Sequence, residues 1–155
     1  MNQSFLITKL EPPAIHNKII QRPRLAGLLN AFQPLNLIIA PAGYGKTTLI
    51  ADWLGNLKQP DDRFFWLTLD EQDNASKRFW TYLAAGFQRT YPLFKYSAEH
   101  LQADTLHFDD PGILNPFLNE IAKIPGRVHL ILDNYHLIEN NDIHRSLNYL
   151  LEYIP

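Results

Sequence analysis

The stretch most able to do chemistry is a glycine-rich loop followed by a lysine and two threonines, "PAGYGKTT", at residues 41–48. In a phosphate-binding loop, backbone N–H groups at the start of a helix surround the β-phosphate. A lysine reaches the β- and γ-phosphates, and a hydroxyl binds Mg²⁺. Here Gly43 and Gly45 would provide the permissive backbone, Lys46 the cation and Thr47 the metal-binding hydroxyl. These residue types, in this order, predict binding of ATP or ADP with Mg²⁺.

One position departs from the usual pattern G-x-x-x-x-G-K-[ST], because Ala40 stands where the first glycine is expected. Alanine fits there if its φ stays negative, and Pro41 stiffens this side of the loop. A chance "GKT" at an ordinary helix start is the alternative. Against that alternative, this loop follows an apolar run and opens an amphipathic helix. The residues expected to surround the phosphates are Ala42, Gly43, Tyr44, Gly45, Lys46, Thr47 and Thr48.

A second group is expected at the end of the apolar run "RVHLILD", residues 127–133. An apolar strand that ends in an acid places the carboxylate at the carboxyl edge of a parallel sheet. Asp133 could there hold Mg²⁺ directly or through water, together with Thr47. Asn134 follows, and its amide cannot accept a proton as a carboxylate does. We therefore place Asp133 and Asn134 at the catalytic position and expect nucleotide binding with slow hydrolysis.

Two further candidates stay open. Asp70 and Glu71 follow the apolar run at 63–69 and could face the γ-phosphate, although acids ahead of a helix are more often N-caps. His136 could sense the phosphate or be an ordinary loop histidine. The tryptophans are expected in the core, namely Trp53, Trp66 and Trp80.

The composition narrows the class of protein. A chain of 155 residues is long enough for one packed domain, and its net charge of -2 gives no electrostatic basis for gripping nucleic acid or an anionic membrane. It has no cysteine, which excludes disulfides and thiolate-bound metals. The N-terminus lacks a signal-peptide pattern, and no apolar run approaches the roughly 18 residues of a membrane-spanning helix. We expect a cytoplasmic protein.

Three apolar runs predict the strands that would position these residues, at 35–40, 63–69 and 127–133. Runs of this kind suit strands buried on both faces, as in a parallel sheet. Helical periodicity lies between them, and strands alternating with helices indicate an α/β wound sheet. With the phosphate loop after the first strand, the expected fold is a P-loop NTPase-type three-layer sandwich with a mainly parallel sheet.

Four helices are expected from the spacing of apolar residues along one face. The second has Asp73 or Asn74 as its N-cap, and the third has Asp110 as its N-cap and Pro111 as its first residue. Pro116 is expected to fall early enough for the first turn to tolerate it. The inward-facing residues are Leu49, Ile50, Trp53, Leu54, Leu57, Phe79, Leu83, Phe87, Leu114, Phe117, Leu118, Ile121, Ile143, Leu147, Leu150, Leu151 and Ile154.

As a set, these motifs resemble the N-terminal ATPase module of the large, MalT-like LuxR-type transcription regulators, within the signal-transduction ATPases with numerous domains (STAND). The resemblance runs in order through nearly the whole chain. It comprises "ITKLEPP", "QRPRL", "APAGYGKTTLIADWL", "FFWLTLDEQDN", "RFWTYLAAGF", "LILDNYHLI" and "LNYLLEYIP". Such regulators commonly carry alanine at the loop entry, so Ala40 is typical of them.

The resemblance implies roles for single residues. Arg22, within "IIQRPRL", would lie on the segment that borders the adenine, and Asp133 would be the acid of the second motif. Many members have a second acid where this chain has Asn134, which again implies slow hydrolysis. The expected division is an N-terminal segment at 1–33 bordering the nucleotide and a P-loop NTPase domain at 34–155 that is incomplete at its C-terminus.

The implied function is an ATP-binding switch in which ATP favours an active, self-associating form and ADP the resting one. Relatives continue into a further strand with a sensor arginine, a winged-helix part, a helical-repeat effector domain and a DNA-binding helix-turn-helix. The chain is therefore expected to be a fragment, truncated before that strand and without its own DNA contact. Two other functions stay open: a small P-loop phosphotransferase, and an interaction fragment that binds no nucleotide.

Overall fold

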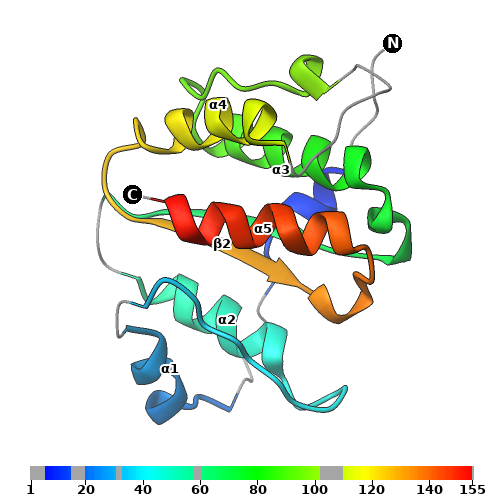
Figure 1. The fold of residues 1–155 in the computed structure, drawn as a ribbon. Coiled ribbons are helices and arrows are strands. Elements are labelled where there is room, and N and C mark those ends of the chain that lie inside the picture. The colour runs from blue at the N-terminus through cyan, green and yellow to red at the C-terminus, as the bar shows by residue number, and fades with distance from the viewer. Residues whose placement is uncertain (1–5, 15–19, 31–32, 58–60, 102–109, 155) are drawn as a thin grey trace. The chain divides into compact units, whose positions relative to one another are not determined.

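The computed structural model describes residues 6–14, 20–30, 33–57, 61–101 and 110–154 (Figure 1). The chain divides into two units, each with its own internal contacts. Unit 1 comprises Met1–Glu11 and Asp61–Pro155, and unit 2 comprises Pro12–Pro60. The acid Asp133 therefore belongs to unit 1, whereas the phosphate loop belongs to unit 2.

Unit 1 contains a two-stranded parallel sheet made of β1 (Arg63–Thr68) and β2 (Val128–Asp133). The register places Thr68 opposite Asp133, and the N–H of Leu69 continues the pairing by donating to the Asp133 C=O at 3.0 Å. Both strands were expected from their apolar runs, and both are confirmed. Because the strands are parallel, the segments that follow β1 and β2 leave from the same edge of the sheet.

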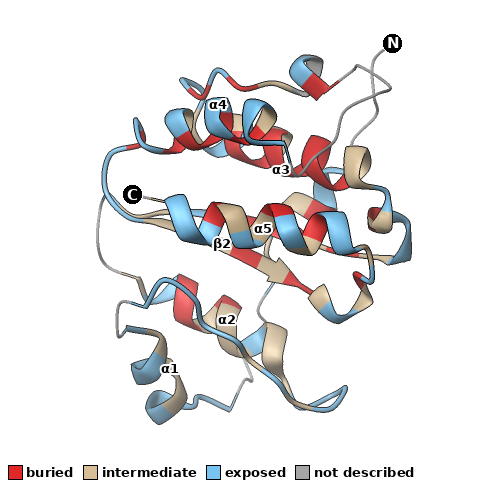
Figure 2. Cartoon of the chain, viewed as in Figure 1, coloured by how far each residue is buried: buried red, intermediate tan, exposed pale blue. Residues whose placement is uncertain are grey.

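Three helices surround this sheet: α3 (Ser76–Thr90), α4 (Pro111–Ile121) and α5 (Asn141–Tyr153). Helix α3 packs against β1, and both α3 and α4 contact α5. Figure 2 shows buried residues on both α3 and α4. On α4 they lie on one face, as the apolar spacing predicts, whereas on α3 they run without a break from Phe79 to Ala84 and so cover more than one face. The confirmed core residues on these helices are Phe79, Leu83, Phe87, Leu114, Phe117, Leu118, Ile121, Ile143 and Leu150.

An aromatic cluster fills the centre of this core. The fully buried ring of Phe117 meets Trp80, Phe87, Phe94 and Tyr96 edge-on, with ring centroids 5.1–5.3 Å apart. Edge-to-face contacts of this kind add to the stabilisation from apolar burial. The cluster therefore ties α4 to α3 and to the segment between them.

The start of α3 differs from the expected one. Asp73 and Asn74 do not cap it, because they belong to a separate 3-10 turn, Glu71–Asn74, and the N-cap position of α3 is Ala75. Asp70 and Asp73 close a capping box around that turn. The side chains of Asp70 and Asp73 accept backbone N–H groups of this turn, so α3 starts only after it.

Helix α4 begins as expected, with Pro111 first and the Asp110 carboxylate accepting the Gly112 N–H at 2.7 Å. Pro116 lies inside the helix, past its first turn, so the expectation for this proline is wrong. Proline has no N–H to donate to the carbonyl four residues earlier. The Gly112 C=O therefore has no donor from within the helix. Both Gly112 and Pro116 are exposed, so water can reach this carbonyl.

Unit 2 contains two short helices that pack together, α1 (Pro23–Asn30) and α2 (Lys46–Gly55). The indole N–H of Trp53 on α2 donates to the Asn30 side-chain oxygen on α1 at 2.8 Å. Among the described residues of both units, no helix is long and apolar enough to cross a bilayer.

The prediction of a strand at 35–40 is wrong. This segment is irregular, and Leu35, Leu37 and Ile39 are 62%, 73% and 83% exposed. A strand is stabilised by hydrogen bonds to a neighbour, and no described residue pairs its backbone with this segment. The fold of the described part is thus α/β with a two-stranded parallel sheet, and the three-layer sandwich stays a prediction.

Candidate functional site

The phosphate loop has the backbone conformation that its glycines were expected to allow. Gly43 and Gly45 both lie in the left-handed region, with φ of 80° and 76°. A Cβ at either position would meet no described atom within 4 Å, so conformation rather than space requires glycine there. Asn134 is the one non-glycine residue with positive φ in the described part, so Ala40 meets the condition under which alanine fits at the loop entry.

Helix α2 starts directly behind this loop, with Lys46 as its first residue and Gly45 at the N-cap position. No described side chain caps the first turn, so its N–H groups and the partial positive charge of the helix end face the loop. The Lys46 ammonium group donates to the C=O groups of Ala40 at 2.5 Å and Pro41 at 3.1 Å. The lysine therefore lies back across the loop entry, within reach of a bound anion.

The other expected loop residues fall on the same structure. Ala42 and Tyr44 are exposed at the loop tip, where the Tyr44 N–H donates to the Pro41 C=O at 3.4 Å. Thr47 and Thr48 lie in the first turn of α2. The glycines, lysine and threonines that the motif predicts are thus all gathered around one helix start.

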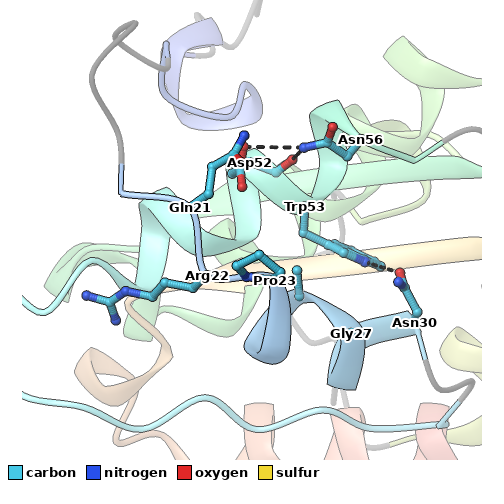
Figure 3. Close-up of a pocket in the computed structure, with 9 residues that line it drawn as sticks. Gln21, Arg22, Pro23, Gly27, Asn30, Asp52, Trp53 and Asn56 are labelled. Atoms are coloured by element: carbon cyan, nitrogen blue, oxygen red, sulfur yellow. Dashed lines mark hydrogen bonds between the residues drawn. The ribbon is translucent and has the colours of Figure 1, made fainter.

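Arg22 precedes α1 and borders a hollow of about 300 Å³ (Figure 3). Gln21 and Asn30 contribute from the α1 side, and Asp52 and Trp53 from α2. The hollow combines an indole ring with amide and carboxylate groups, which can contact a flat polar ring system. Figure 3 shows the Arg22 side chain extending away from the Trp53–Asn30 hydrogen bond.

Asp133 ends β2 and is 8% exposed, and Asn134 begins the turn that follows. Asn134 has φ 61° and ψ 30°, and its N–H donates to the Asp133 carboxylate at 3.1 Å. Asparagine is among the few non-glycine residues that adopt this left-handed conformation readily. The asparagine thus has a conformational role in the turn, besides any role toward a nucleotide. His136 is exposed in the same turn.

Asp70 has the capping role that sequence patterns favoured for it. Its carboxylate accepts the Gln72 N–H at 2.9 Å and the Lys9 ammonium at 3.0 Å. Desolvation opposes its charge, but the hydrogen bond and charge of Lys9 outweigh that effect and hold the pKa of Asp70 below its ordinary 3.8. A carboxylate held this way is a poor proton acceptor, so Asp70 is unsuited to be a general base.

Lys9 is the residue of this region that sequence reasoning missed. It is 7% exposed and forms an ion pair with Asp73, which is fully buried. Arg78 reaches the same carboxylate at 2.9 Å, and the Lys9 ammonium lies 4.8 Å from the centroid of the Tyr82 ring. No local pattern marks Lys9, because its partners follow it by more than 60 residues.

The amino-acid sequence of the chain is similar to those of known transcription regulators. The HTH-type transcriptional regulator MalT of Yersinia pestis (strain Pestoides F) is 35% identical over 150 residues, which is 96% of this chain. That of Vibrio cholerae serotype O1 is 33% identical over 93% of the chain. This chain is similar to MalT regulators along nearly its whole length. The resemblance expected from its motifs is thereby confirmed.

The chain spans 16% of the length of these MalT relatives. No family model matches it. Within this MalT-like stretch, unit 2 gathers the loop residues and Arg22, and unit 1 holds Asp133 and Asn134. Among the residues that the structure describes, no three histidine, aspartate or glutamate side chains form a group able to hold a metal ion.

Proposed function

We propose that this chain is the nucleotide-binding switch module of a MalT-like transcription regulator and that it binds ATP and ADP with Mg²⁺. The observation that carries the proposal is the loop geometry. Two left-handed glycines lead into the uncapped start of α2, and Lys46 lies across the loop entry. The similarity to MalT regulators over 96% of the chain supports it independently.

The residues of the loop would divide the work of holding phosphate. The N–H groups from Ala42 to Thr48 would surround the phosphates, and Lys46 would exchange its two carbonyl partners for phosphate oxygens. Thr47 and Asp133 would hold Mg²⁺, which neutralises phosphate charge when it is bound. Arg22 and the hollow beside it would contact the nucleoside. The expected three-layer sandwich belongs to the same proposal, without a strand at 35–40.

Slow hydrolysis follows from the groups near the carboxyl edge of the sheet in unit 1. The Asn134 amide is no base, and Asp70 is engaged with Lys9 and Gln72. General-base assistance typically contributes about 10²- to 10⁴-fold to a rate, and neither residue can provide it. A switch needs little turnover, since a ligand that distinguishes two states by about 1.4 kcal/mol shifts their ratio tenfold.

In a whole regulator, we propose that the ATP-bound state favours self-association and activation of transcription. The printed names of the relatives describe HTH-type regulators. DNA recognition would be the work of segments outside the stretch that this chain shares with them, since its net charge of -2 offers no basis for it. Nucleotide binding by the stretch itself is the step to test first.

Titration of the chain with fluorescent ATP and ADP analogues tests the proposal. The variant Lys46→Ala removes the cation aimed at the phosphates, so we expect it to weaken ATP and ADP binding by about tenfold or more, or ~1.4 kcal/mol. Its matched control is Arg24→Ala, which removes one positive charge from an exposed position on α1 of the same unit. The control should bind as the parent does.

Unlabelled adenosine, used as a competitor, separates the two parts of the site. Lys46→Ala should leave competition by adenosine unchanged, whereas Arg22→Ala should weaken competition by adenosine and by ATP alike. A parent chain that binds neither ATP nor ADP refutes the proposal, and so does equal ATP affinity in Lys46→Ala and the parent. Phosphate release, measured on the same samples, reports the rate of hydrolysis.

A further inference from the structure

Asn74 uses its whole side chain to join the segments that follow β1 and β2. Its Nδ2 donates to the C=O groups of Glu71 at 3.0 Å and Leu137 at 2.7 Å. Its Oδ1 accepts the backbone N–H groups of Glu139 at 2.7 Å and Asn140 at 3.1 Å. An amide has two N–H donors and one oxygen with two lone pairs, so the hydrogen-bonding capacity of Asn74 is filled.

Asn140 makes the reciprocal contacts from the second segment. Its Nδ2 donates to the Asn74 C=O at 2.7 Å and to the Ser76 hydroxyl at 3.2 Å. Its Oδ1 accepts the Asp142 N–H at 2.9 Å, which makes Asn140 the N-cap of α5. Asn140 therefore starts α5 and, through the same side chain, fixes that start to the turn before α3.

The turn that contains Asn74 is held in place by the ion pairs of a buried carboxylate. Asp73, in the same turn, is fully buried and pairs with both Lys9 and Arg78. Its carboxylate also accepts the Asp70 N–H at 2.9 Å. The hydrogen bonds within 134–140 are local, such as Leu137 N–H to Asn134 C=O at 3.0 Å. The segment also has Ile138 in the core and a hydrogen bond from Tyr135 to His144 at 2.6 Å. Asn74 thus adds backbone contacts between this segment and a turn anchored by buried charge.

That segment begins directly behind Asp133. We propose that Asn74 is a positioning residue for Asp133: by fixing 134–140 at Leu137, Glu139 and Asn140, it sets the left-handed turn at Asn134 and holds the Asp133 carboxylate where it would bind Mg²⁺. This inference rests on the proposed function, in which Asp133 is a metal ligand. Asn74 itself touches neither metal nor nucleotide in this role.

The test compares ATP binding in Mg²⁺ and in EDTA for the parent chain and for Asn74→Asp. The substitution keeps the size of the side chain but replaces the N–H donors to Glu71 and Leu137 with an acceptor. The matched control is Asn115→Asp on α4, an exposed asparagine that accepts a hydrogen bond from the Tyr149 hydroxyl. It has the same chemical change away from the two segments.

In the parent, Mg²⁺ should raise the affinity for ATP. We expect this gain to be about tenfold smaller in Asn74→Asp, or ~1.4 kcal/mol, with the affinity for ATP in EDTA unchanged. The control should retain the full gain from Mg²⁺. A merely structural role would lower both affinities together, because it would reduce the folded fraction whatever the metal. Amide hydrogen exchange in a second variant, Asn74→Ala, provides a direct second readout. This variant removes the acceptor Oδ1, so the N–H groups of Glu139 and Asn140 should exchange faster in it than in the parent.

The outcomes separate this inference from the proposed function. A parent that binds no ATP refutes the proposed function and the metal role with it. A parent that binds ATP, with an equal gain from Mg²⁺ in Asn74→Asp, overturns the inference alone. Equal losses in Mg²⁺ and EDTA for Asn74→Asp also overturn it, and so does unchanged exchange at Glu139 and Asn140 in Asn74→Ala.

Discussion

Replacing Lys9 with methionine is expected to destabilise unit 1 strongly, although the residue lies near the start of the chain. Methionine keeps the apolar stem and removes the ammonium group. Lys9 is 7% exposed, and the carboxylate of its partner Asp73 is fully buried. Without Lys9, that carboxylate keeps Arg78 and the Asp70 N–H as partners. The loss therefore leaves a buried charge that is only partly compensated.

The size of the effect follows from those remaining partners. Breaking a buried ion pair so that one charge is left uncompensated typically costs about 3–5 kcal/mol. Because Arg78 still reaches Asp73, the loss should be closer to that of one charged hydrogen bond, about 2–3 kcal/mol. A chain of this length loses about 2–4 °C in Tm per kcal/mol, so the expected drop is about 4–12 °C.

Urea and thermal unfolding of the parent, Lys9→Met and Lys123→Met provide the measurement. Lys123 pairs with Glu120 at the surface and its side chain is 62% exposed, so its loss should cost less than about 1 kcal/mol. The double variant Lys9→Met with Asp73→Asn should lose less stability than the sum of the two single variants, since they share one interaction. Equal losses in Lys9→Met and Lys123→Met, or additive losses in the double variant, would refute the reasoning.

Two further predictions concern unit 1. Gly126 has φ 80°, and a Cβ there would lie 2.0 Å from the Asp61 C=O oxygen. Gly126→Ala should therefore lower Tm by more than Gly43→Ala does. The second substitution adds only left-handed strain of about 1–2 kcal/mol. Equal Tm losses would contradict this. Burial raises the pKa of Tyr96 from 10.0 to about 12, so its contribution to stability is complete below pH 10 and is lost as the pH rises toward 12. In unfolding experiments, Tyr96→Phe should lose less stability at high pH than the parent does. It should also remove one high-pH phenolate transition from the ultraviolet titration. An unchanged titration would contradict the prediction.

The features predicted correctly from the sequence depend on neighbours along the chain. The φ of Gly43 and Gly45, the start of α2 at Lys46 and the Asp110 cap each involve groups a few residues apart. The apolar face of α4 follows from helical spacing alone. These choices are local, so residue type and order are enough to predict them.

The failures and omissions involve partners far away in sequence. The run at 35–40 has the composition of a strand, yet it stays irregular because a strand also needs a neighbour for its backbone, which composition does not specify. The sequence favours Asp70 as a cap over a role facing the γ-phosphate, and its contact with Lys9 supports that preference. The contact with Lys9, 61 residues earlier, is the part that its position in the sequence does not indicate.

The sequence by itself thus determined the conformation of the glycine-rich loop, the helix behind it and the two paired strands of this MalT-like chain. Only the tertiary structure decided that Lys9 is buried against Asp73 and that Asn74 joins the segments behind β1 and β2. The physical reason is that such contacts form between groups 63 to 65 residues apart. The Asn74 contacts form where the parallel strands place their carboxyl ends at one edge, and the Lys9 contact forms where the turn Ile7–Leu10 packs beside β1. Residue order encodes local conformation directly, whereas those pairings exist only once distant segments have packed together.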